Sequence, residues 1–341
     1  MRPIRKVLPT FSKILAGNLS NFSSVREIEI KRPIAEQLFE DVTTHYDNPN
    51  HTPKPINKKL ATKWSQHLEK IIKKEDPELS RTLEAAKVEK NAVVLLSGII
   101  QPEILPLEVP KTNEELQGNK SLQKKLMSTE AIFSAYALSL GLNPDPCTDG
   151  SLVGYIFASP SSSNLSQISE NLRWHNDGWQ TGDPVEKILL MGMFNNNSGT
   201  RTELLTFDQI SDQFKKNGKG DLLQDLNEYC YIENPFDEVQ VFQQAKILDQ
   251  KTGKINFSCQ GIFSSKNPKF QEAILYLNES FDAIKPLISI EISPGQIVAI
   301  DNLSTTHQKK VEEADPSKEV MPIFQKRLIG RMTGDAPPQS K

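Results

Sequence analysis

Two histidines and one aspartate have the residue types and the spacing that could bind a transition metal. Residues 173–178 read RWHNDG, which places His175 two positions before Asp177. In a β-strand, residues i and i+2 point to the same side, so these two side chains could bind one ion together. A third candidate, His307, lies far downstream and would be brought across by a distant strand. Two histidines and one carboxylate form the facial triad that holds Fe(II) with positions open for a co-substrate and O2.

The other three histidines are weaker candidates. His45 also precedes an aspartate, Asp47, at the same spacing, but residues 47–55 contain three prolines, which favours a turn-rich connector. His51 lies inside that connector. His67 lies near the apolar face of a predicted helix, where a packing role is more common than metal binding.

The sequence before His307 predicts a strand. Residues 294–295 (Pro-Gly) indicate a tight turn, residues 296–300 form a short apolar run, and residues 301–302 (Asp-Asn) end it. We expect this strand to deliver the following loop, with His307, to the mouth of a barrel.

Two arginines further downstream could bind carboxylates. Arg327 and Arg331 are four residues apart in a strand-like segment, so both guanidinium groups could point into one cavity. Each could grip a carboxylate through two parallel hydrogen bonds, which a lysine cannot do. The alternative is a pair of surface arginines on an edge strand, where their charges guard against aggregation. The apolar neighbours Leu328, Ile329 and Met332 favour a core strand instead.

Composition and charge exclude several classes of partner. The chain has 341 residues, of which 37% are hydrophobic, enough for one large domain or two medium ones. A net charge of −3 gives no general attraction to nucleic acid or to anionic membranes. The three cysteines are scattered, so neither a disulfide framework nor a structural zinc site is indicated. No apolar run approaches the length of a membrane span.

The N-terminal segment carries basic residues but lacks the other marks of a targeting peptide. Arg2, Arg5, Lys6 and Lys13 lie among apolar residues before the first acid, Glu27, but no apolar core or small-residue cleavage site follows. These features favour a surface arm or a first helix packed on the domain. Together with the cysteine pattern, they predict a cytoplasmic protein.

The pattern of apolar residues changes along the chain. Apolar residues recur at helical spacing within 34–42, 60–72 and 122–140. A first short strand is expected at 91–96. Further short apolar segments follow, and they occupy 152–158, 188–194, 239–248, 287–292, 297–300 and 323–332. Two more helices are expected, one at 208–214 that continues to residue 229 and one at 270–283.

Many short strands without regular βαβ alternation predict an α+β protein with a mainly β core. The expected architecture is a double-stranded β-helix, or jelly-roll barrel, with flanking helices. We expect a single domain over residues 1–341, in which a helical part at 1–90 packs on a jelly-roll core at 91–335 with helical insertions. The segment 159–164 (SPSSSN) is either a flexible linker or an active-site lid.

Four local patterns, in the same order, resemble the Fe(II)/2-oxoglutarate-dependent oxygenases. The chain is similar in particular to the clavaminate synthase-like group of amino-acid hydroxylases, which is related to taurine dioxygenase. The patterns are LLSG at 95–98 with LP at 105–106, WHND at 174–177, PG at 294–295 through DN at 301–302 to His307, and RLIGR at 327–331.

The resemblance implies a role for each matching residue. His175, Asp177 and His307 would bind iron. Arg327, assisted by the hydroxyl group of Thr202, would bind the distal carboxylate of 2-oxoglutarate, and Arg331 would bind the carboxylate of the substrate. Fe(II) would be the cofactor, with 2-oxoglutarate and O2 as co-substrates. The reaction would be hydroxylation of an unactivated carbon in a small carboxylate-bearing molecule, an amino acid or an amino-acid derivative.

Some positions depart from the family pattern. Many relatives carry glutamate where Asp177 stands. Asn256 and Ser258 occupy positions where arginine-specific members place aspartates, which suggests an uncharged or amide-bearing substrate side chain. The sequence leaves open the oligomeric state and whether the amino acid is free or bound to a carrier.

Two other readings remain. One is a cupin-like metal protein, a hydrolase or isomerase that does not use 2-oxoglutarate. The other is a binding protein on a barrel that has lost its activity. An arginine opposite the metal, as expected for Arg327, favours the oxygenase, because a hydrolase has no need of it. The complete triad argues against lost activity.

Overall fold

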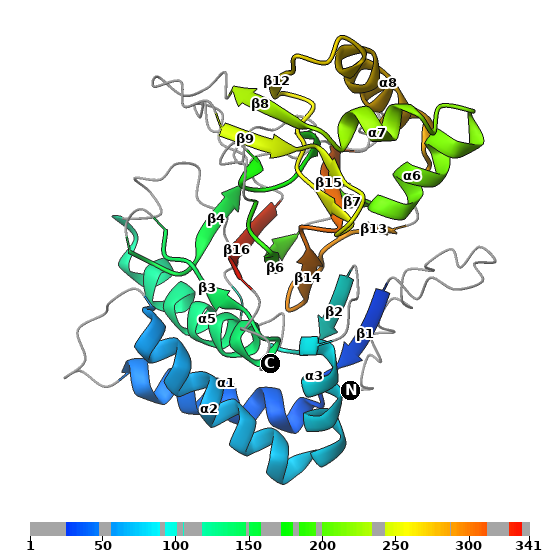
Figure 1. Cartoon of the computed structure of the whole chain (residues 1–341). Coiled ribbons are helices and arrows are strands. Elements are labelled where there is room, and N and C mark those ends of the chain that lie inside the picture. Colours follow the sequence, from blue (N-terminus) through cyan, green and yellow to red (C-terminus); the bar gives the residue numbers. More distant parts are fainter. Residues whose placement is uncertain are drawn as a thin grey trace, which may run out of the picture.

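The structure is a computed structural model, and it combines a sheet-rich core with two groups of helices (Figure 1). It describes residues 25–47, 56–88, 93–100, 105, 118–147, 150–157, 172–179, 184–195, 200–233, 243–286, 288–311 and 327–335. The basic N-terminal segment and the serine-rich segment at 159–164 lie outside the described residues. Among the described helices, none has both the length and the apolar character needed to cross a membrane.

The larger sheet has seven strands in the order β1-β2-β14-β6-β16-β3, with β4 also paired to β16. Only β1 and β2 run parallel among these described pairs. The strands are β1 (Val25–Glu29), β2 (Val93–Ser97), β3 (Asn143–Pro144), β4 (Gly154–Phe157), β6 (Lys187–Asn195), β14 (Ile297–Asp301) and β16 (Arg327–Asp335).

The second sheet has four strands in the order β13-β7-β15-β5, all antiparallel. These strands are β5 (Leu172–His175), β7 (Thr200–Thr206), β13 (Ile288–Ile290) and β15 (Thr305–Val311). Two smaller sheets lie in the insertion between β7 and β13. They consist of β12-β8-β9 and of the β10-β11 pair, with bounds β8 (Tyr229–Glu233), β9 (Gln243–Lys246), β10 (Leu248–Asp249), β11 (Lys254–Ile255) and β12 (Ile262–Ser264).

The central strands of the larger sheet are apolar on both faces because both faces are covered. In β14, Ile297 and Ala299 belong to the core that the sheet shares with the N-terminal helices. Val298 and Ile300 point the other way, into the core between the two sheets. This alternation explains why β2, β6 and β14 appear in the sequence as continuous apolar runs.

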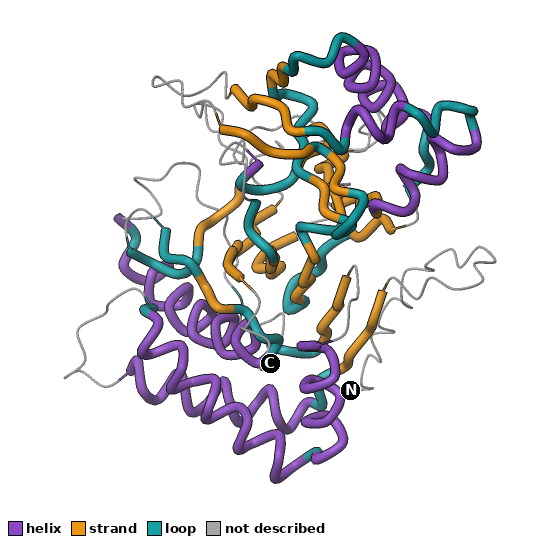
Figure 2. Tube along the Cα trace, viewed as in Figure 1, coloured by secondary structure: helices purple, strands orange, loops and turns teal. Residues whose placement is uncertain are grey.

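A layer of helices covers one face of the larger sheet (Figures 1 and 2). It consists of α1 (Arg32–Asp47), α2 (Lys58–Glu75), α3 (Pro77–Val88) and α5 (Lys120–Ser139). Helix α2 begins where the side chain of Asn57 accepts a hydrogen bond from the backbone N of Leu60 at 3.0 Å, a usual N-cap. Its buried face includes Trp64 and Leu68, in line with the predicted helical spacing.

Strand β1 is the exception in this N-terminal part. The sequence analysis expected residues 1–90 to be helical, but residues 25–29 pair in register with β2 at the edge of the sheet. Their sequence, VREIE, is too short and too charged to indicate a strand by periodicity alone.

The second group of helices lies at the other end of the molecule (Figure 1). It contains α6 (Phe207–Lys216), α7 (Leu222–Leu226) and α8 (Lys269–Ala283). The expected continuous helix to residue 229 is wrong, because Gly218 adopts a left-handed conformation with φ of 68° after the end of α6. A glycine in that conformation commonly ends a helix. Tyr229 begins β8 instead.

Candidate metal centre

The three candidate ligands come together where β5 and β15 pair. His175 ends β5, and His307 lies directly opposite it on β15. Asp177 lies in the turn that follows β5, and not in a strand as the i, i+2 argument assumed. His307 lies within a strand, and not in the expected loop, because the turn at 301–304 closes before it.

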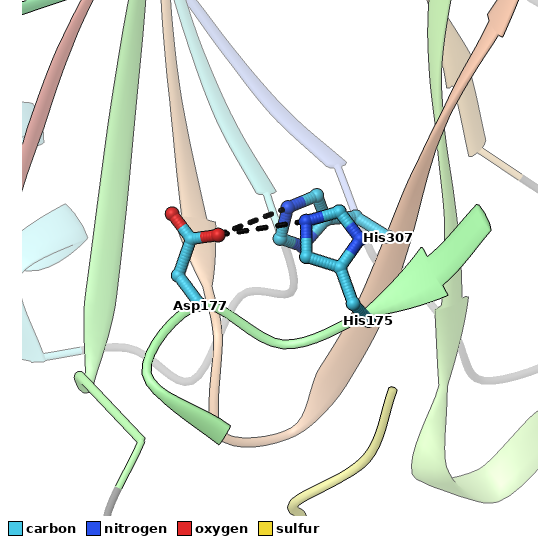
Figure 3. Close-up of side chains that lie close together, drawn as sticks. All are labelled: His175, Asp177 and His307. Atoms are coloured by element: carbon cyan, nitrogen blue, oxygen red, sulfur yellow. Dashed lines mark ion pairs between the residues drawn. The ribbon is translucent and has the colours of Figure 1, made fainter. Parts of the chain in front are cut away.

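The side chains of these residues face one another (Figure 3). The nearest carboxylate oxygen of Asp177, Oδ1, lies 3.5 Å from Nε2 of His175 and 3.8 Å from Nε2 of His307. The candidate ligand atoms all lie within 4.8 Å of one another. Ligands at adjacent corners of an octahedron, each about 2.1 Å from the metal, are about 3 Å apart. Shifts of less than about 1 Å would therefore let the three atoms share one ion.

A backbone contact orients His175. Its Nδ1 lies 2.7 Å from the carbonyl oxygen of Arg173. A carbonyl oxygen only accepts, so Nδ1 donates this hydrogen bond, and Nε2, which lies nearer Asp177, is the nitrogen that could bind a metal. Metal-binding histidines are commonly fixed in this way by a hydrogen bond at the other ring nitrogen.

His307 is also in the state that a metal ligand requires. Burial, reinforced by the neighbouring His175 and Arg331, lowers the pKa of His307 to about 3. The imidazole is therefore neutral at ordinary pH, and no proton has to leave before a metal binds.

The two oxygens of Asp177 have different neighbours. Oδ1 faces the imidazoles, whereas Oδ2 accepts a hydrogen bond of 3.2 Å from Nη1 of Arg331. Burial alone would raise the pKa of the Asp177 carboxyl. The contact with His175 and the charge of Arg331 outweigh burial and hold this pKa well below its usual range. The carboxylate is therefore ionised and ready to bind a cation.

Two buried asparagines hold the loop that carries Asp177. Asn302 accepts a hydrogen bond from the backbone N of Asp177 at 3.1 Å and donates to the backbone O of Asp177 at 3.0 Å. Asn176 donates to the carbonyl oxygens of Asn302 and Thr305, at 2.5 and 2.6 Å. These bonds tie the turn after β5 to the turn between β14 and β15, so the two halves of the triad are positioned together.

The triad lies in a pocket that is open to solvent, with about 560 Å³ of empty space when the solvent at its mouth is included. Its wall is largely apolar, and the apolar lining residues are Ile156, Leu172, Ile188, Leu190 and Ile329. The remaining lining residues besides the triad are Thr202, Gln308, Lys309 and Arg331. Such a wall limits water, while a few polar groups can orient a small ligand.

The structure places the other predicted site residues as follows. Thr202, on β7, and Arg331, on β16, both line the cavity. Arg327 begins β16, and its side chain lies outside the described residues. Asn256 and Ser258 are buried, and neither is among the lining residues.

Lys309 and Asn302 were missed by the sequence analysis. Lys309 follows His307 by two residues, so the strand period could have indicated it once β15 was known. Asn302 was recognised only as the end of a strand. The prediction for His67 agrees with the structure, since its Nε2 lies 2.7 Å from Oδ2 of Asp41, within the helical layer.

No family model and no curated protein matches the chain. Solved structures do match over most of its length. Asparagine oxygenase in complex with Fe(II), 2S,3S-3-hydroxyasparagine and succinate has a TM-score of 0.65 and 15% identity, covering 91% of this chain and 93% of that one. The non-heme iron oxygenase OrfP in complex with Fe, succinate and (3S)-hydroxy-L-Arg has a TM-score of 0.67 and 15% identity, covering 91% and 94%. OrfP in complex with Fe and alpha-ketoglutaric acid has a TM-score of 0.64. The chain therefore has the fold of these amino-acid oxygenases.

Proposed function

We propose that the protein is a non-haem iron, 2-oxoglutarate-dependent dioxygenase that hydroxylates an unactivated carbon of an amino acid or an amino-acid derivative. The observation that carries this proposal is the convergence of His175, Asp177 and His307 in one cavity. The ligand set is the one used by non-haem Fe(II) oxygenases, and it occurs here in a fold shared with two of them.

The same proposal includes the architecture. The two main sheets, which share an apolar core, would form a double-stranded β-helix, or jelly-roll barrel. Residues 1–341 would form a single domain, with the part at 1–90 packed on the core at 91–335. The helical layer and the larger sheet share one continuous core, which supports this organisation. A cytoplasmic location is in keeping with the scattered free cysteines.

Each residue of the centre would have a defined task. Iron would supply O2 activation coupled to the decarboxylation of 2-oxoglutarate to succinate. His175, Asp177 and His307 would hold the ion on one face and leave the other face to the co-substrates. Arg327 and Thr202 would bind the distal carboxylate of 2-oxoglutarate, and Thr202 is in place on the cavity wall. The apolar wall would keep water from the reacting atoms.

Arg331 would bind the carboxylate of the substrate. Its side chain is 39% exposed and uses only one guanidinium nitrogen for Asp177, so further N–H groups can reach a ligand in the cavity. An α-amino acid held there would extend its side chain toward the metal. Among the described lining residues, Asp177 is the single acid, which favours an uncharged side chain over a cationic one.

The cupin-like hydrolase or isomerase has less support. Asparagine oxygenase is solved with Fe(II) and succinate, and OrfP with Fe and alpha-ketoglutaric acid, so both structural neighbours belong to the oxygenase class.

Anaerobic titration with Fe(II) and 2-oxoglutarate tests the ligand set. The wild type should develop a metal-to-keto-acid charge-transfer band, and His307→Ala should not, because the only other described histidine that lines the cavity, His175, is already one of the three proposed ligands. His67→Ala is the matched control and should keep the band. An unchanged band in His307→Ala would show that the ligand set is wrong.

A succinate-release assay with Fe(II), ascorbate and 2-oxoglutarate identifies the substrate. The panel should contain free amino acids and amino acids attached to a carrier. Succinate release that rises with one amino acid, together with a product that is heavier by one oxygen atom, would support hydroxylation. A charge-transfer band without any coupled oxidation across the panel would contradict the amino-acid assignment.

A further inference from the structure

Lys309 shares the inner face of the second sheet with the metal ligand His307. Strands β15 and β7 pair without a register shift, so that Leu204 lies opposite His307 and Thr202 lies opposite Lys309. Directly opposite residues of an antiparallel pair project to the same face. Thr202, His307 and Lys309 all line the cavity, in agreement with this register.

The next lysine, Lys310, points to the other face. Its Nζ lies 3.8 Å from Oε1 of Glu203, and its side chain is 56% exposed. Glu203 also accepts a hydrogen bond of 2.6 Å from Gln308. Two consecutive lysines therefore have different surroundings: Lys310 pairs with Glu203 and is mostly exposed, and Lys309 lines the cavity.

The distance between Lys309 and the metal centre suits a short dicarboxylate. Two residues along a strand are about 6.6 Å apart, and this is the separation of His307 and Lys309 along β15. In 2-oxoglutarate, three C–C bonds of about 1.5 Å each separate the keto carbon from the distal carboxylate carbon. With its keto end at the metal, the distal carboxylate would lie at the level of Thr202 and within reach of the flexible Lys309 side chain.

We propose that Lys309 binds the distal carboxylate of the keto acid, together with Thr202, and so restricts the co-substrate to dicarboxylic keto acids. This inference rests on the proposed function. Because the surrounding wall is largely apolar, the ammonium–carboxylate contact is weakly screened and strongly favours an anionic end over a methyl group.

The test compares two keto acids of equal chain length. 2-Oxoglutarate and 2-oxopentanoate differ in that a methyl group replaces the distal carboxylate. Each is titrated anaerobically into the Fe(II)-loaded protein, and the dissociation constant is taken from the charge-transfer band. We expect Lys309→Met to weaken 2-oxoglutarate binding by roughly 10- to 100-fold and to leave 2-oxopentanoate binding unchanged. Lys309→Arg should keep part of the preference, and Lys310→Met should keep all of it.

The outcomes separate this inference from the proposed function. If Lys309→Met and Lys309→Arg weaken the binding of both keto acids equally, Lys309 does not contact the distal carboxylate. The same conclusion holds if neither dissociation constant changes. If the wild type develops no band with either keto acid, the oxygenase assignment itself fails and this inference fails with it. Thermal unfolding of each variant, measured alongside, checks that the lysine substitutions leave the fold intact.

Discussion

The two oxygens of the Asp177 carboxylate have different neighbours. Oδ1 of Asp177 faces the two imidazoles, and Oδ2 accepts a hydrogen bond from Arg331. The sequence analysis assigned Arg331 only to the carboxylate of the substrate, and the structure adds its contact with Asp177. Arg331 is thus positioned both to orient Asp177 and to meet a second anion.

Arg331→Met separates substrate binding from co-substrate binding. We expect turnover of the amino acid to collapse, while the charge-transfer band with 2-oxoglutarate survives. The physical reason is that loss of the guanidinium removes the carboxylate anchor of the substrate but none of the proposed contacts of the keto acid. Turnover is measured by succinate release. Loss of the band together with turnover, in a variant that still binds Fe(II) by calorimetry, would place Arg331 in the co-substrate site.

Burial of His307 makes the metal-free protein less stable in acid. The pKa of this group is about 3 in the folded state and 6.5 in its unperturbed state. Between these values the unfolded chain binds a proton that the folded state excludes, so stability decreases as pH falls below about 6.5. At pH 5 this loss is on the order of 2 kcal/mol.

Urea unfolding with a chelator present, at pH 7 and pH 5, measures this dependence. His307→Gln should lose less stability than the wild type over that interval, because the glutamine cannot take up a proton. Equal losses in the two proteins would show that His307 does not titrate in this way.

The turn between β14 and β15 is the element that supports the centre. Its Asn302 side chain makes three hydrogen bonds, two to the backbone of Asp177 and one, of 2.7 Å, to the carbonyl of Val185. All of these partners are backbone groups, so the turn fixes the position of the Asp177 loop whatever side chains the loop carries.

Asn302→Asp should disturb this support without changing the side-chain volume. The carboxylate would replace a donor that faces two carbonyl oxygens, and a buried unsatisfied group costs roughly 1–3 kcal/mol. We expect lower stability in urea and weaker Fe(II) binding by calorimetry. Asn217→Asp is the control, since Asn217 bonds to the Tyr276 hydroxyl at the surface. Unaltered Fe(II) affinity in Asn302→Asp would contradict a positioning role.

Whether a strand could be predicted from the sequence depends on whether its inner face packs in the core or carries candidate site residues. Strands β2, β6 and β14 lie between two apolar layers and have apolar sequences, so the sequence analysis located them. Strand β15 (TTHQKKV) was missed, because His307 and Lys309 occupy its inner face in place of apolar residues. The alternation of apolar and polar residues that marks a strand is therefore weakest in the strand that carries the candidate site residues. Similarly, the triad was found from residue types, whereas the local conformation of Asp177 and the contact with Arg331 depend on tertiary structure.

At the scale of the whole molecule, the candidate metal centre and the helical layer lie on opposite faces of the larger sheet. Fully buried Phe133 of α5 belongs to the helical side and lies close to Gly330 of β16. Ile329, the neighbour of Gly330, points to the other side and lines the cavity. The sheet therefore separates the core that it shares with the helices from the cavity that contains the candidate metal ligands.

Phe133→Ala should lower stability without altering the metal ligands. Removing a buried phenyl ring leaves a cavity that costs about 3–5 kcal/mol. Leu275 is 63% exposed. As a control, Leu275→Ala should change the free energy of unfolding by less than about 0.5 kcal/mol. Guanidinium chloride unfolding measures both. A small effect of Phe133→Ala would show that α5 packs less tightly on the sheet than the structure indicates.

The pairing of β5 with β15 also has a consequence for folding. His175 and His307 become neighbours only when segments distant in the chain have paired, whereas α1 and α2 contact each other and are consecutive in the sequence. Pairing of distant segments costs loop-closure entropy before the stabilising contacts form. We therefore expect the triad to assemble late in folding. An ion that binds the assembled triad but not the unfolded chain stabilises the whole molecule, by about 4 kcal/mol at a thousandfold excess over its dissociation constant. With iron as the proposed ion, its supply during synthesis would then influence the fraction of the protein that is folded as well as the fraction that is active.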